Sequence, residues 1–332
     1  PKRRLLCVVM DGVGYSKSTF GNAVLAAKTP FLNELAAHST FTTLKAHGTY
    51  VGLPSNSDIG NSEVGHNALG AGRIYDQGAK LADNAIRSGE MFKGDTWQEL
   101  IKQVKSKSST LHFIGLLSDG NVHAHQEHLH AMMRQAKKEG VKRVRIHVLF
   151  DGRDVAEKSA EVYVDRLNRV ISELKSPDFD VAVASGGGRM FVTMDRYEAD
   201  WNIVERGWHA HVLGVASHKF HSLTEAVKTF REDPVLVDQN FPPFVIIDEK
   251  SEPVGEIDDN DAVIFYNFRG DRAIEITKAF TQKDFKAFDR VHFPKVYYAG
   301  MMQYDGDLLI PEKYLVSPPH ITETLTEELL KY

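Results

Sequence analysis

The sequence contains a single cysteine, Cys7, so it excludes a framework of internal disulfide bonds and is typical of a reducing compartment. Long apolar runs are also absent, since none approaches the ~20 residues that a membrane-spanning helix needs. The basic start Pro1–Arg4 precedes only the run Leu5–Met10, which is too short for the core of a signal peptide. No internal repeat or low-complexity tract is present. These absences predict a cytoplasmic protein that does not enter a membrane.

An excess of basic charge is likewise missing, because 40 Lys and Arg stand against 45 Asp and Glu, for a net charge of -5. The basic residues occur in small groups near glycines instead of one stripe, which argues against a general nucleic-acid binder. With 42% hydrophobic and 26% charged residues, the composition is that of a globular protein. A chain of 332 residues exceeds what one core usually spans, so two domains are expected.

Several short apolar runs end at a polar motif that contains glycine. Without clean alternation of apolar and polar residues, such runs are typical of buried strands in a parallel sheet. The runs are Leu5–Met10, Leu111–Leu117, Val144–Phe150, Asp180–Ala184 and Ala262–Tyr266.

Helical patterns lie between these runs and predict an α/β architecture. In Gln126–Glu139 the apolar residues Leu129, Met132, Met133 and Ala136 form a stripe, and Gly140 is predicted to follow the helix end. Glu157–Leu174 also reads as a helix, with inward residues Val162, Leu167, Val170, Ile171 and Leu174. In such folds ligands bind at the carboxyl ends of the strands, where the polar motifs lie.

Ser62 lies in the stretch GNSEVGHNALGAGR, which lacks the G-x-S-x-G spacing of a hydrolase nucleophile. Two interpretations remain open: Ser62 caps a helix, or it is a nucleophile at a helix N-terminus that holds a phosphoryl group or a metal. Asp11, directly after the first apolar run, is similarly either a helix cap or a ligand of a hard cation.

The segment 121–130 contains four histidines, at positions 123, 125, 128 and 130. A zinc site is disfavoured, since the i, i+4 pair of an H-E-x-x-H motif is absent and no cysteine pair accompanies it. We expect His123, nearest the strand end, to contact a substrate and the other three to lie on the surface.

Five arginines follow strand ends or lie just beyond them: Arg153, Arg189, Arg196, Arg269 and Arg272. The stretch Gly186–Arg189 is similar to an anion-binding nest, in which backbone N–H groups and a guanidinium converge. Because guanidinium groups match phosphate and carboxylate geometry, several of them predict a small, highly anionic substrate such as a phosphorylated acid.

The motifs VVMDGVG, VGLPSNSDIGNSEVGHNALGAGR, GLLSDGNVHAH, LFDGRD, SGGGRMFVTMDR and IFYNFRGDR together resemble the cofactor-independent phosphoglycerate mutase family, in order and spacing across nearly the whole chain. SGGGRMFVTMDRY and MMQYDGDL most resemble its plant and trypanosomatid branch. The family interconverts 3-phosphoglycerate and 2-phosphoglycerate in glycolysis and gluconeogenesis. Its fold consists of two three-layer α/β domains with largely parallel sheets, an alkaline-phosphatase-like domain being interrupted by a transferase domain.

The resemblance implies a role for each matching residue. Asp11 would be a metal ligand, and Ser62 would both contact the metal and carry a phosphoserine intermediate. His123, Arg153, Asp154, Arg189, Arg196, Arg269 and Arg272 would bind the substrate. Asp154 is also our hypothesis for a proton shuttle to the glycerate hydroxyls. Two divalent ions are implied, Mn²⁺ first and Mg²⁺ or Co²⁺ as alternatives, without 2,3-bisphosphoglycerate, in a monomer that acts on a small molecule and binds no nucleic acid.

The resemblance places the first part of the phosphatase-like domain at residues 1–78, the transferase domain at 79–316 and a return segment at 317–332. The linkers around 77–79 and 317–319 would be hinges, and a helix is expected in the tail. The family's Ala-Asp-His-Gly-Asn motif and catalytic Lys, which belong to a later segment, are missing. We therefore expect the N-terminal part of a longer enzyme. The alternatives are an inactive phosphoglycerate-binding fragment and a related enzyme that acts on a sugar phosphate.

Overall fold

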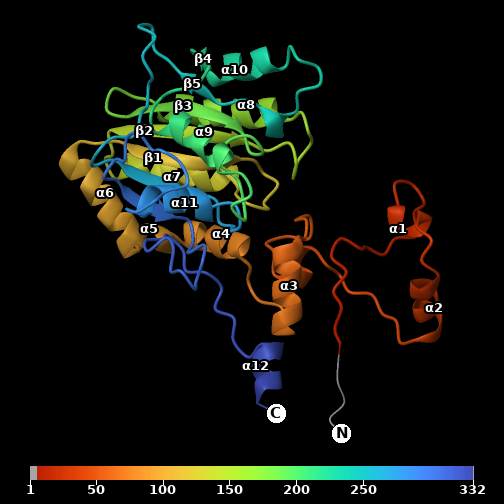
Figure 1. Ribbon diagram of the computed structural model, residues 1–332. Helices are drawn as coiled ribbons and strands as arrows, with labels where there is room; N and C mark the ends of the chain where they lie inside the picture. Colours follow the sequence, from red (N-terminus) through yellow and green to blue (C-terminus); the bar gives the residue numbers. More distant parts are fainter. Residues whose placement is uncertain (1–5, 332) are drawn as a thin grey trace. The chain divides into compact units, whose positions relative to one another are not determined.

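The computed structural model describes residues 6–331, which divide into two units (Figure 1). The first unit contains the residues up to Tyr75 together with those from Ile321 onward, and the second contains Asp76–His320. The family resemblance implies boundaries at residues 78 and 316, a few residues away at each end. Along the chain, the second unit is therefore an insertion within the first.

The second unit is built on a seven-stranded sheet with the strand order β4-β5-β3-β2-β1-β6-β7. All neighbouring strands run parallel except β3 and β5, which are antiparallel. The strands are β1 (Leu111–Leu117), β2 (Arg143–Phe150), β3 (Asp180–Gly188), β4 (His218–Phe220), β5 (Phe244–Ile246), β6 (Ala262–Phe265) and β7 (Tyr297–Gly300). This sheet confirms the predicted α/β class.

Four predicted strands lie in this sheet as β1, β2, β3 and β6, because their apolar runs are covered on both faces. Every residue of β1 is buried, and β2 is buried from its second residue onward. β3 continues past the predicted end at Ala184 as far as Gly188. The prediction contains no counterpart of the short strands β4, β5 and β7.

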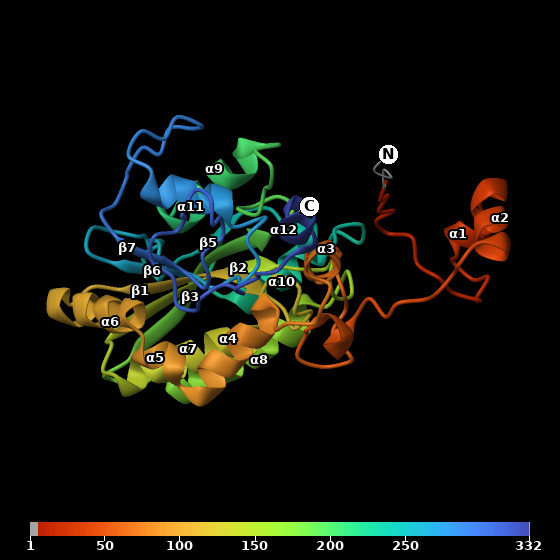
Figure 2. The same cartoon turned by 90° about the horizontal axis from the view of Figure 1, so that it is seen from below.

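Helices cover both faces of the sheet and make a three-layer unit. Figure 2 shows α9 and α11 on one face, and α6, α7 and α8 on the other. The helices of this unit are α4 (Gly78–Ser88), α5 (Glu90–Lys93), α6 (Asp95–Lys107), α7 (Gln126–Lys138), α8 (Ala160–Leu174), α9 (Trp201–His211), α10 (Leu223–Phe230) and α11 (Ile274–Thr281), with the 3-10 helix η2 (Asp238–Asn240).

The helical patterns of the sequence match α7 and α8 with one error. The predicted stripe of α7 is buried, and Gly140 after its end has a φ of 83°, as a residue beyond a helix C-cap commonly does. In α8, Leu167, Val170 and Leu174 are buried as predicted, but Val162 is 48% exposed. The prediction for Val162 is wrong because the neighbouring Tyr163 and Val164 make the buried face of the first turn.

The segment Gln77–Ala79, predicted as a hinge, belongs to the start of α4 instead. Gln77 is the N-cap residue of the helix, and it and Ala79 are both buried. Gly78 packs against Met302, since a Cβ there would lie 3.2 Å from the Met302 sulfur. Residues 77–79 therefore belong to the packed start of a helix.

The first unit contains helices but no strand among its described residues. They are α1 (Ala23–Ala26), α2 (Pro30–His38), α3 (Ser62–Ala71) and α12 (Leu325–Leu330), with the 3-10 helix η1 (Gly48–Val51). The tail helix was predicted, and Thr324 and Glu327 form a capping box at its start. Arg73 ties the two parts of the unit together by donating to the carbonyl of Thr322 at 2.6 Å.

The predicted strand Leu5–Met10 is wrong wherever it can be compared, because residues 6–10 have no regular secondary structure. Leu5 lies outside the described residues. A strand requires a neighbour for its backbone hydrogen bonds, and the described part of this unit offers none. Leu6, Val8 and Val9 are consequently exposed. The second three-layer domain that the resemblance implies is not seen in residues 6–331. Within the same range, no helix is both long and apolar enough to cross a membrane.

Candidate functional site

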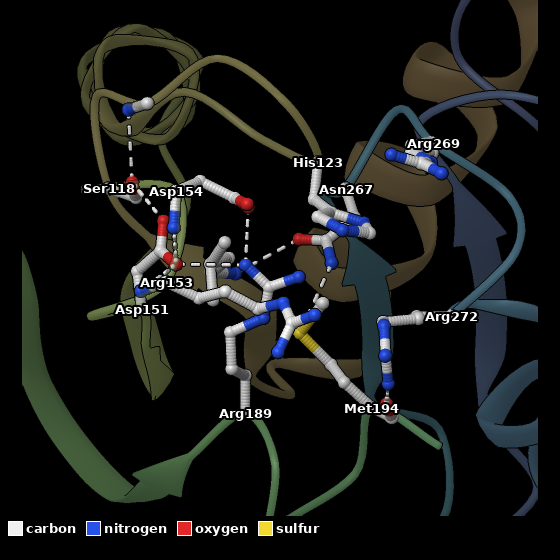
Figure 3. Close-up of polar contacts among 12 residues, drawn as sticks. Ser118, His123, Asp151, Arg153, Asp154, Arg189, Met194, Asn267, Arg269 and Arg272 are labelled. Atoms are coloured by element: carbon white, nitrogen blue, oxygen red, sulfur yellow. Dashed lines mark hydrogen bonds and ion pairs between the residues drawn. The ribbon is translucent and has the colours of Figure 1, made fainter. Parts of the chain in front are cut away.

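Polar side chains gather at the carboxyl ends of the central parallel strands of the second unit. Ser118, Asp151 and Arg189 directly follow β1, β2 and β3, and Asn267 is the second residue after β6. Figure 3 shows these side chains converging at one edge of the sheet. Since parallel neighbours bring their carboxyl ends to the same edge, the topology itself assembles this group.

Arg189 is held at the centre by carboxylates. Its NH1 atom donates to Oδ1 of Asp151 at 2.8 Å and also to Oδ2 of Asp154. The other oxygen of Asp151 accepts a hydrogen bond of 2.6 Å from the Ser118 hydroxyl. Backbone N–H groups of Arg153 and Asp154 donate to Asp151 at 3.1 and 3.0 Å. Asp151 therefore fixes both the loop that carries Arg153 and Asp154 and the guanidinium of Arg189.

The predicted anion nest at Gly186–Arg189 is wrong, because these glycines continue strand β3. The N–H of Gly188 donates to the carbonyl of Phe241 at 2.8 Å, and that of Arg189 donates to Phe150 at 3.0 Å, so neither is directed to a ligand. A Cβ on Gly188 would collide with the backbone of Gln239. These glycines allow a close backbone approach, and within this stretch only the side chain of Arg189 remains a candidate for anion binding.

A second group of charges surrounds Asp271. Its Oδ1 lies 3.1 Å from Nε of Arg269 and 3.7 Å from Nδ1 of His123, and its Oδ2 accepts from NH1 of Arg196 at 3.4 Å. One carboxylate thus faces two guanidinium groups and an imidazole. The group retains a net positive charge even with His123 neutral.

Burial and like charge act together on Arg272 and His123. Arg272 donates to the carbonyl oxygen of Met194 at 2.6 Å. Burial first, and then the neighbouring guanidinium groups of Arg189 and Arg196, lower the pKa of Arg272 to about 10. Burial, followed by the charges of Arg189 and Arg269, lowers the pKa of His123 well below its ordinary value. An anion placed among these groups would offset their repulsion.

The remaining predicted residues fall in the same neighbourhood. Arg153 is exposed, and its charge is among those that lower the pKa of Arg272. All seven residues predicted to bind substrate therefore lie at the carboxyl end of the sheet: His123, Arg153, Asp154, Arg189, Arg196, Arg269 and Arg272. The structure brings them together; whether they bind the substrate stays a prediction.

Five further residues of the site were not predicted from the sequence: Ser118, Asp151, Met194, Asn267 and Asp271. Asn267 is fully buried, and its Oδ1 accepts from the N–H of Leu116 at 2.9 Å. Its Nδ2 faces the sulfur of Met194 at 3.7 Å. Ser118, Asp151 and Asn267 could have been predicted from their position, because each lies within two residues of a strand end. The arginines were predicted from the same kind of position.

Two of the histidines predicted to lie on the surface are buried. His128 is 4% exposed and His130 is 1% exposed. The ring of His128 packs edge-on against Phe268, with centroids 6.0 Å apart, and its Nε2 lies 4.0 Å from Asp83 of α4. The prediction is wrong for these two because α4 packs against α7 and covers this side of the helix.

In the first unit, Ser62 and Asp11 are in direct contact. The hydroxyl of Ser62 donates to Oδ2 of Asp11 at 2.7 Å and lies 3.2 Å from Nδ1 of His66. The cap interpretation of Ser62 is wrong by one residue, since Asn61 is the N-cap and its side chain accepts from the N–H of Val64 at 3.3 Å. Ser62 opens α3, so its side chain can face a ligand instead of the helix backbone.

The donor set of Asp11 and Ser62 suits a hard divalent cation, because both atoms are oxygen and lie within reach of one ion. Across residues 6–331 no group of three or more His, Cys, Asp or Glu is arranged to hold a metal. Asp11 and Ser62 alone do not make a complete ligand set within these residues.

A comparison with protein-family models matches residues 82–306 to BPG-independent PGAM N-terminus (iPGM_N). The chain belongs to this family. The matched range contains every predicted substrate-binding residue, whereas Asp11 and Ser62 lie outside it.

Curated relatives agree with this assignment. A Leptospira interrogans protein named "Probable 2,3-bisphosphoglycerate-independent phosphoglycerate mutase" is 54% identical over 328 residues, covering 98% of this chain and 60% of that protein. The 2,3-bisphosphoglycerate-independent phosphoglycerate mutase of Trypanosoma brucei brucei is 51% identical over 332 residues, covering 99% of this chain and 60% of its own length.

A solved structure of Leishmania mexicana phosphoglycerate mutase at low cobalt concentration is similar with a TM-score of 0.94 and 53% identity. It is matched over 97% of this chain and 59% of its own. The chain thus spans about 60% of the length of the relatives that it matches.

Proposed function

We propose that this protein interconverts 3-phosphoglycerate and 2-phosphoglycerate without 2,3-bisphosphoglycerate, a reaction of glycolysis and gluconeogenesis. The observation that carries the proposal is the cluster of buried and half-buried arginines around His123 at the carboxyl end of the sheet. A phosphoglycerate carries a phosphate and a carboxylate, and each can accept paired hydrogen bonds from a guanidinium group. The names of the relatives are those of enzymes for this reaction.

The second unit supplies the recognition of the substrate. Arg272 and Arg196, whose charges repel in the empty cluster, gain a counter-charge when an anion enters. Arg189 is already paired with Asp151 and Asp154. It therefore serves as a fixed donor that orients the anion, while Arg272, which donates to a carbonyl oxygen and not to a carboxylate, supplies positive charge.

Ser62 supplies the nucleophile. Its hydroxyl attacks the phosphoryl group, the bond to the glycerate oxygen breaks, and the resulting phosphoserine later returns the phosphoryl group to the other hydroxyl. The first residue of α3 is a favourable place for this, because the positive end of a helix dipole stabilises a phosphoryl group.

The proposal includes two divalent ions, Mn²⁺ first and Mg²⁺ or Co²⁺ as alternatives, with Asp11 and Ser62 among their ligands. When bound, such ions favour deprotonation of the Ser62 hydroxyl and offset phosphoryl charge. The relative from Leishmania mexicana was studied with cobalt, which agrees with a divalent requirement. We place the protein in the cytoplasm, in keeping with its single cysteine.

The test combines turnover with binding. In the longer enzyme of which we expect this chain to be the N-terminal part, we expect conversion of 3-phosphoglycerate in Mn²⁺ without 2,3-bisphosphoglycerate, and loss of conversion with a chelator. Turnover is measured on that enzyme, and binding is measured on it and on this chain. Ser62→Ala should abolish turnover while calorimetry still detects binding of 3-phosphoglycerate. Turnover that survives Ser62→Ala would overturn the nucleophile assignment.

Two other outcomes decide the alternatives. Binding of 3-phosphoglycerate without turnover in any of the three metals would favour a phosphoglycerate-binding module. Absence of binding would refute the proposed function of the arginine cluster, and preferential binding of a sugar phosphate would replace the substrate.

A further inference from the structure

A chain of buried polar side chains crosses the sheet of the second unit and ends beside the arginine cluster. It begins at Asp261, whose Oδ2 lies 3.1 Å from Nε2 of His112 on β1. Nδ1 of His112 lies 3.0 Å from Nε2 of His147 on β2, and the two rings are stacked with centroids 5.3 Å apart. Both histidines are fully buried.

The chain continues through β3 to α9. Nδ1 of His147 lies 2.7 Å from the hydroxyl of Ser185, which lies 2.7 Å from Nδ1 of His211. Nε2 of His211 lies 2.9 Å from the hydroxyl of Thr193. Ser185, His211 and Thr193 are also buried. Polar groups packed this deeply must satisfy one another, because water does not reach them.

A β-bulge places Ser185 in this chain. Ile146 pairs with Val183, but the next residue, His147, pairs with Ser185, so Ala184 is the extra residue of β3. Without the bulge, Ala184 would stand opposite His147 and offer no hydroxyl. Bulges commonly re-aim a side chain next to a functional site.

The direction of every hydrogen bond in the chain follows from its first member. Burial opposes ionisation of Asp261, but hydrogen bonds from His112 and from backbone N–H groups hold its pKa below the ordinary value, so it is a carboxylate and only accepts. Burial lowers the pKa of His112, of His147 and, to about 3, of His211, so each ring carries one proton.

His112 must then donate from Nε2 to Asp261, which leaves its Nδ1 to accept from Nε2 of His147. Nδ1 of His147 accepts from Ser185, and Ser185 accepts from Nδ1 of His211. Nε2 of His211 remains as the acceptor for the hydroxyl of Thr193. Every ring nitrogen and hydroxyl group in the series then has a partner, and all these bonds point toward Asp261.

Thr193 requires such support. Its φ of 69° lies in the left-handed region, which a β-branched residue rarely adopts. Its N–H donates to the carbonyl of Ile203 at 2.7 Å. Position 207 on α9 is glycine, and any Cβ there would collide with the Thr193 hydroxyl. The strained backbone is therefore held by one backbone bond, by the fit against Gly207 and by the bond to His211.

The residues that follow Thr193 enter the site. The carbonyl of Met194 accepts from NH1 of Arg272 at 2.6 Å, and Arg196 pairs with Asp271. The left-handed turn at Thr193 thus sets the direction in which the Met194 carbonyl points, and with it the position of Arg272.

We propose that the chain Asp261–His112–His147–Ser185–His211 positions the substrate-binding arginines through Thr193. Thr193 and His211 are positioning residues for Arg272. The effect on phosphoglycerate binding rests on the proposed function, whereas the direction of the chain and the placement of Arg272 do not.

The direction of the hydrogen bonds is tested by nitrogen NMR on protein labelled with ¹⁵N-histidine. The signals of each histidine ring are assigned from a variant in which that histidine is replaced. We expect the proton on Nε2 in His112 and His147 but on Nδ1 in His211. Asp261→Asn removes the carboxylate that sets the direction and should shift the ring signals of His211, although residue 261 does not contact it. A proton on Nε2 of His211 in the unaltered chain, or unchanged signals in Asp261→Asn, would overturn the proposal.

The positioning role is tested by two matched variants. Thr193→Val keeps the branched shape but removes the donor to His211, whereas Thr193→Ser keeps the donor. We expect Thr193→Val to weaken 3-phosphoglycerate binding by about tenfold or more, and Thr193→Ser by about twofold or less. In a turnover assay the change should appear in KM more than in kcat. Equal affinities for the two variants would overturn the proposal.

A readout without substrate separates this proposal from the proposed function. The Arg272 guanidinium N–H signals should shift in Thr193→Val and in Asp261→Asn, and stay in place in Thr193→Ser. If the unaltered chain fails to bind 3-phosphoglycerate, the proposed function fails, and these signals still decide the positioning role. Should Thr193→Val not fold, Asp261→Asn carries the same test. If the guanidinium N–H signals of Arg272 do not shift in a folded Thr193→Val or Asp261→Asn variant, the positioning role is refuted.

Discussion

Arg189 and Asp151 form an ion pair inside the protein: NH1 of Arg189 lies 2.8 Å from Oδ1 of Asp151, and each side chain is only 1% exposed. Replacing Asp151 removes one of the two carboxylates that neutralise the buried Arg189 guanidinium, Asp154 being the other, and weakening a buried pair costs far more than losing a pair in water. Asp151→Asn should therefore lower the free energy of unfolding of the second unit by about 3 kcal/mol, as measured by urea denaturation. The matched control is Glu173→Gln in the exposed pair Arg134–Glu173, with an expected loss below about 1 kcal/mol. Equal losses would contradict the buried pair.

His128 should make the protein sensitive to acid. Burial lowers its pKa from 6.5 to about 3, so between these values the unfolded chain binds a proton that the folded chain does not. Stability is therefore fully present above pH 6.5 and falls by about 1.4 kcal/mol per pH unit as the pH drops below it. His128→Leu should reduce the loss between pH 7 and pH 4 by about 3 kcal/mol, measured by urea unfolding at each pH. The exposed control is His221→Asn, which should leave the pH dependence of the unfolding free energy unchanged. The same unchanged pH dependence in His128→Leu would refute the role of His128.

Glu275 should make the protein less stable as the pH rises, which is the opposite of the effect of His128. Burial, and then the nearby Asp195, raise its pKa from 4.5 to about 7, so the folded chain holds a proton that the unfolded chain has released. Its contribution is complete below pH 4.5 and is lost as the pH rises toward 7. In Glu275→Gln the free energy of unfolding should fall less between pH 5 and pH 8, by about 2 kcal/mol relative to the unaltered protein. Glu249→Gln, an exposed position, is the control, and parallel pH profiles for both variants would count against the assignment.

Tyr304 links the ends of β6 and β7 through its buried hydroxyl. The hydroxyl oxygen lies 2.7 Å from the carbonyl of Phe265 and 2.8 Å from that of Asn267, and it accepts from the N–H of Met301 at 3.1 Å. Tyr304→Phe removes the hydroxyl donor to the carbonyl of Asn267, whereas the N–H of Met301 keeps its bond of 2.9 Å to the carbonyl of Phe265. The change should cost about 1–3 kcal/mol in thermal or urea unfolding. Tyr197→Phe, at an 80% exposed ring, should cost almost nothing. A neutral Tyr304→Phe would show that water replaces the hydroxyl.

Asp154 is our candidate for a proton shuttle, and it is half-buried in an ion pair with Arg189. Asp154→Asn keeps the shape but cannot take up a proton, so turnover should fall by about a hundredfold or more, with 3-phosphoglycerate affinity changed far less. Steady-state turnover and calorimetry on the same preparation separate the two effects. Glu157→Gln, exposed on the same loop, is the matched control. Unchanged turnover in Asp154→Asn would exclude the shuttle.

The long strands could be predicted because burial on both faces leaves a signature in the residues themselves. β1 is apolar except for His112, β2 ends in the apolar run Val148–Phe150, and each strand stops at a polar residue that belongs to the site. β4 and β5 contain only 3 residues each, and their character depends on pairing with chain segments far away in sequence. No local pattern marks such strands.

The site was predictable where a residue type alone decides its chemistry, as for the arginines after strand ends. It was not predictable where packing decides. His128 and His130 look like surface residues until α4 covers them, and the glycines before Arg189 look like a nest until β3 is seen to continue through them. The bulge at Ala184 leaves no mark in the sequence, although it determines which side chain meets His147.

The bond from Arg73 to Thr322 joins residues 249 positions apart, on either side of the inserted unit. The two ends of the inserted unit, far apart in sequence, therefore follow and precede residues that lie close together in space. Such adjacency permits circular permutation, since a linker of a few residues can join positions 320 and 76 while new termini open in a surface loop. A permuted 76–320 chain should retain the arginine cluster, because all its members and the strands that position them lie between those two points.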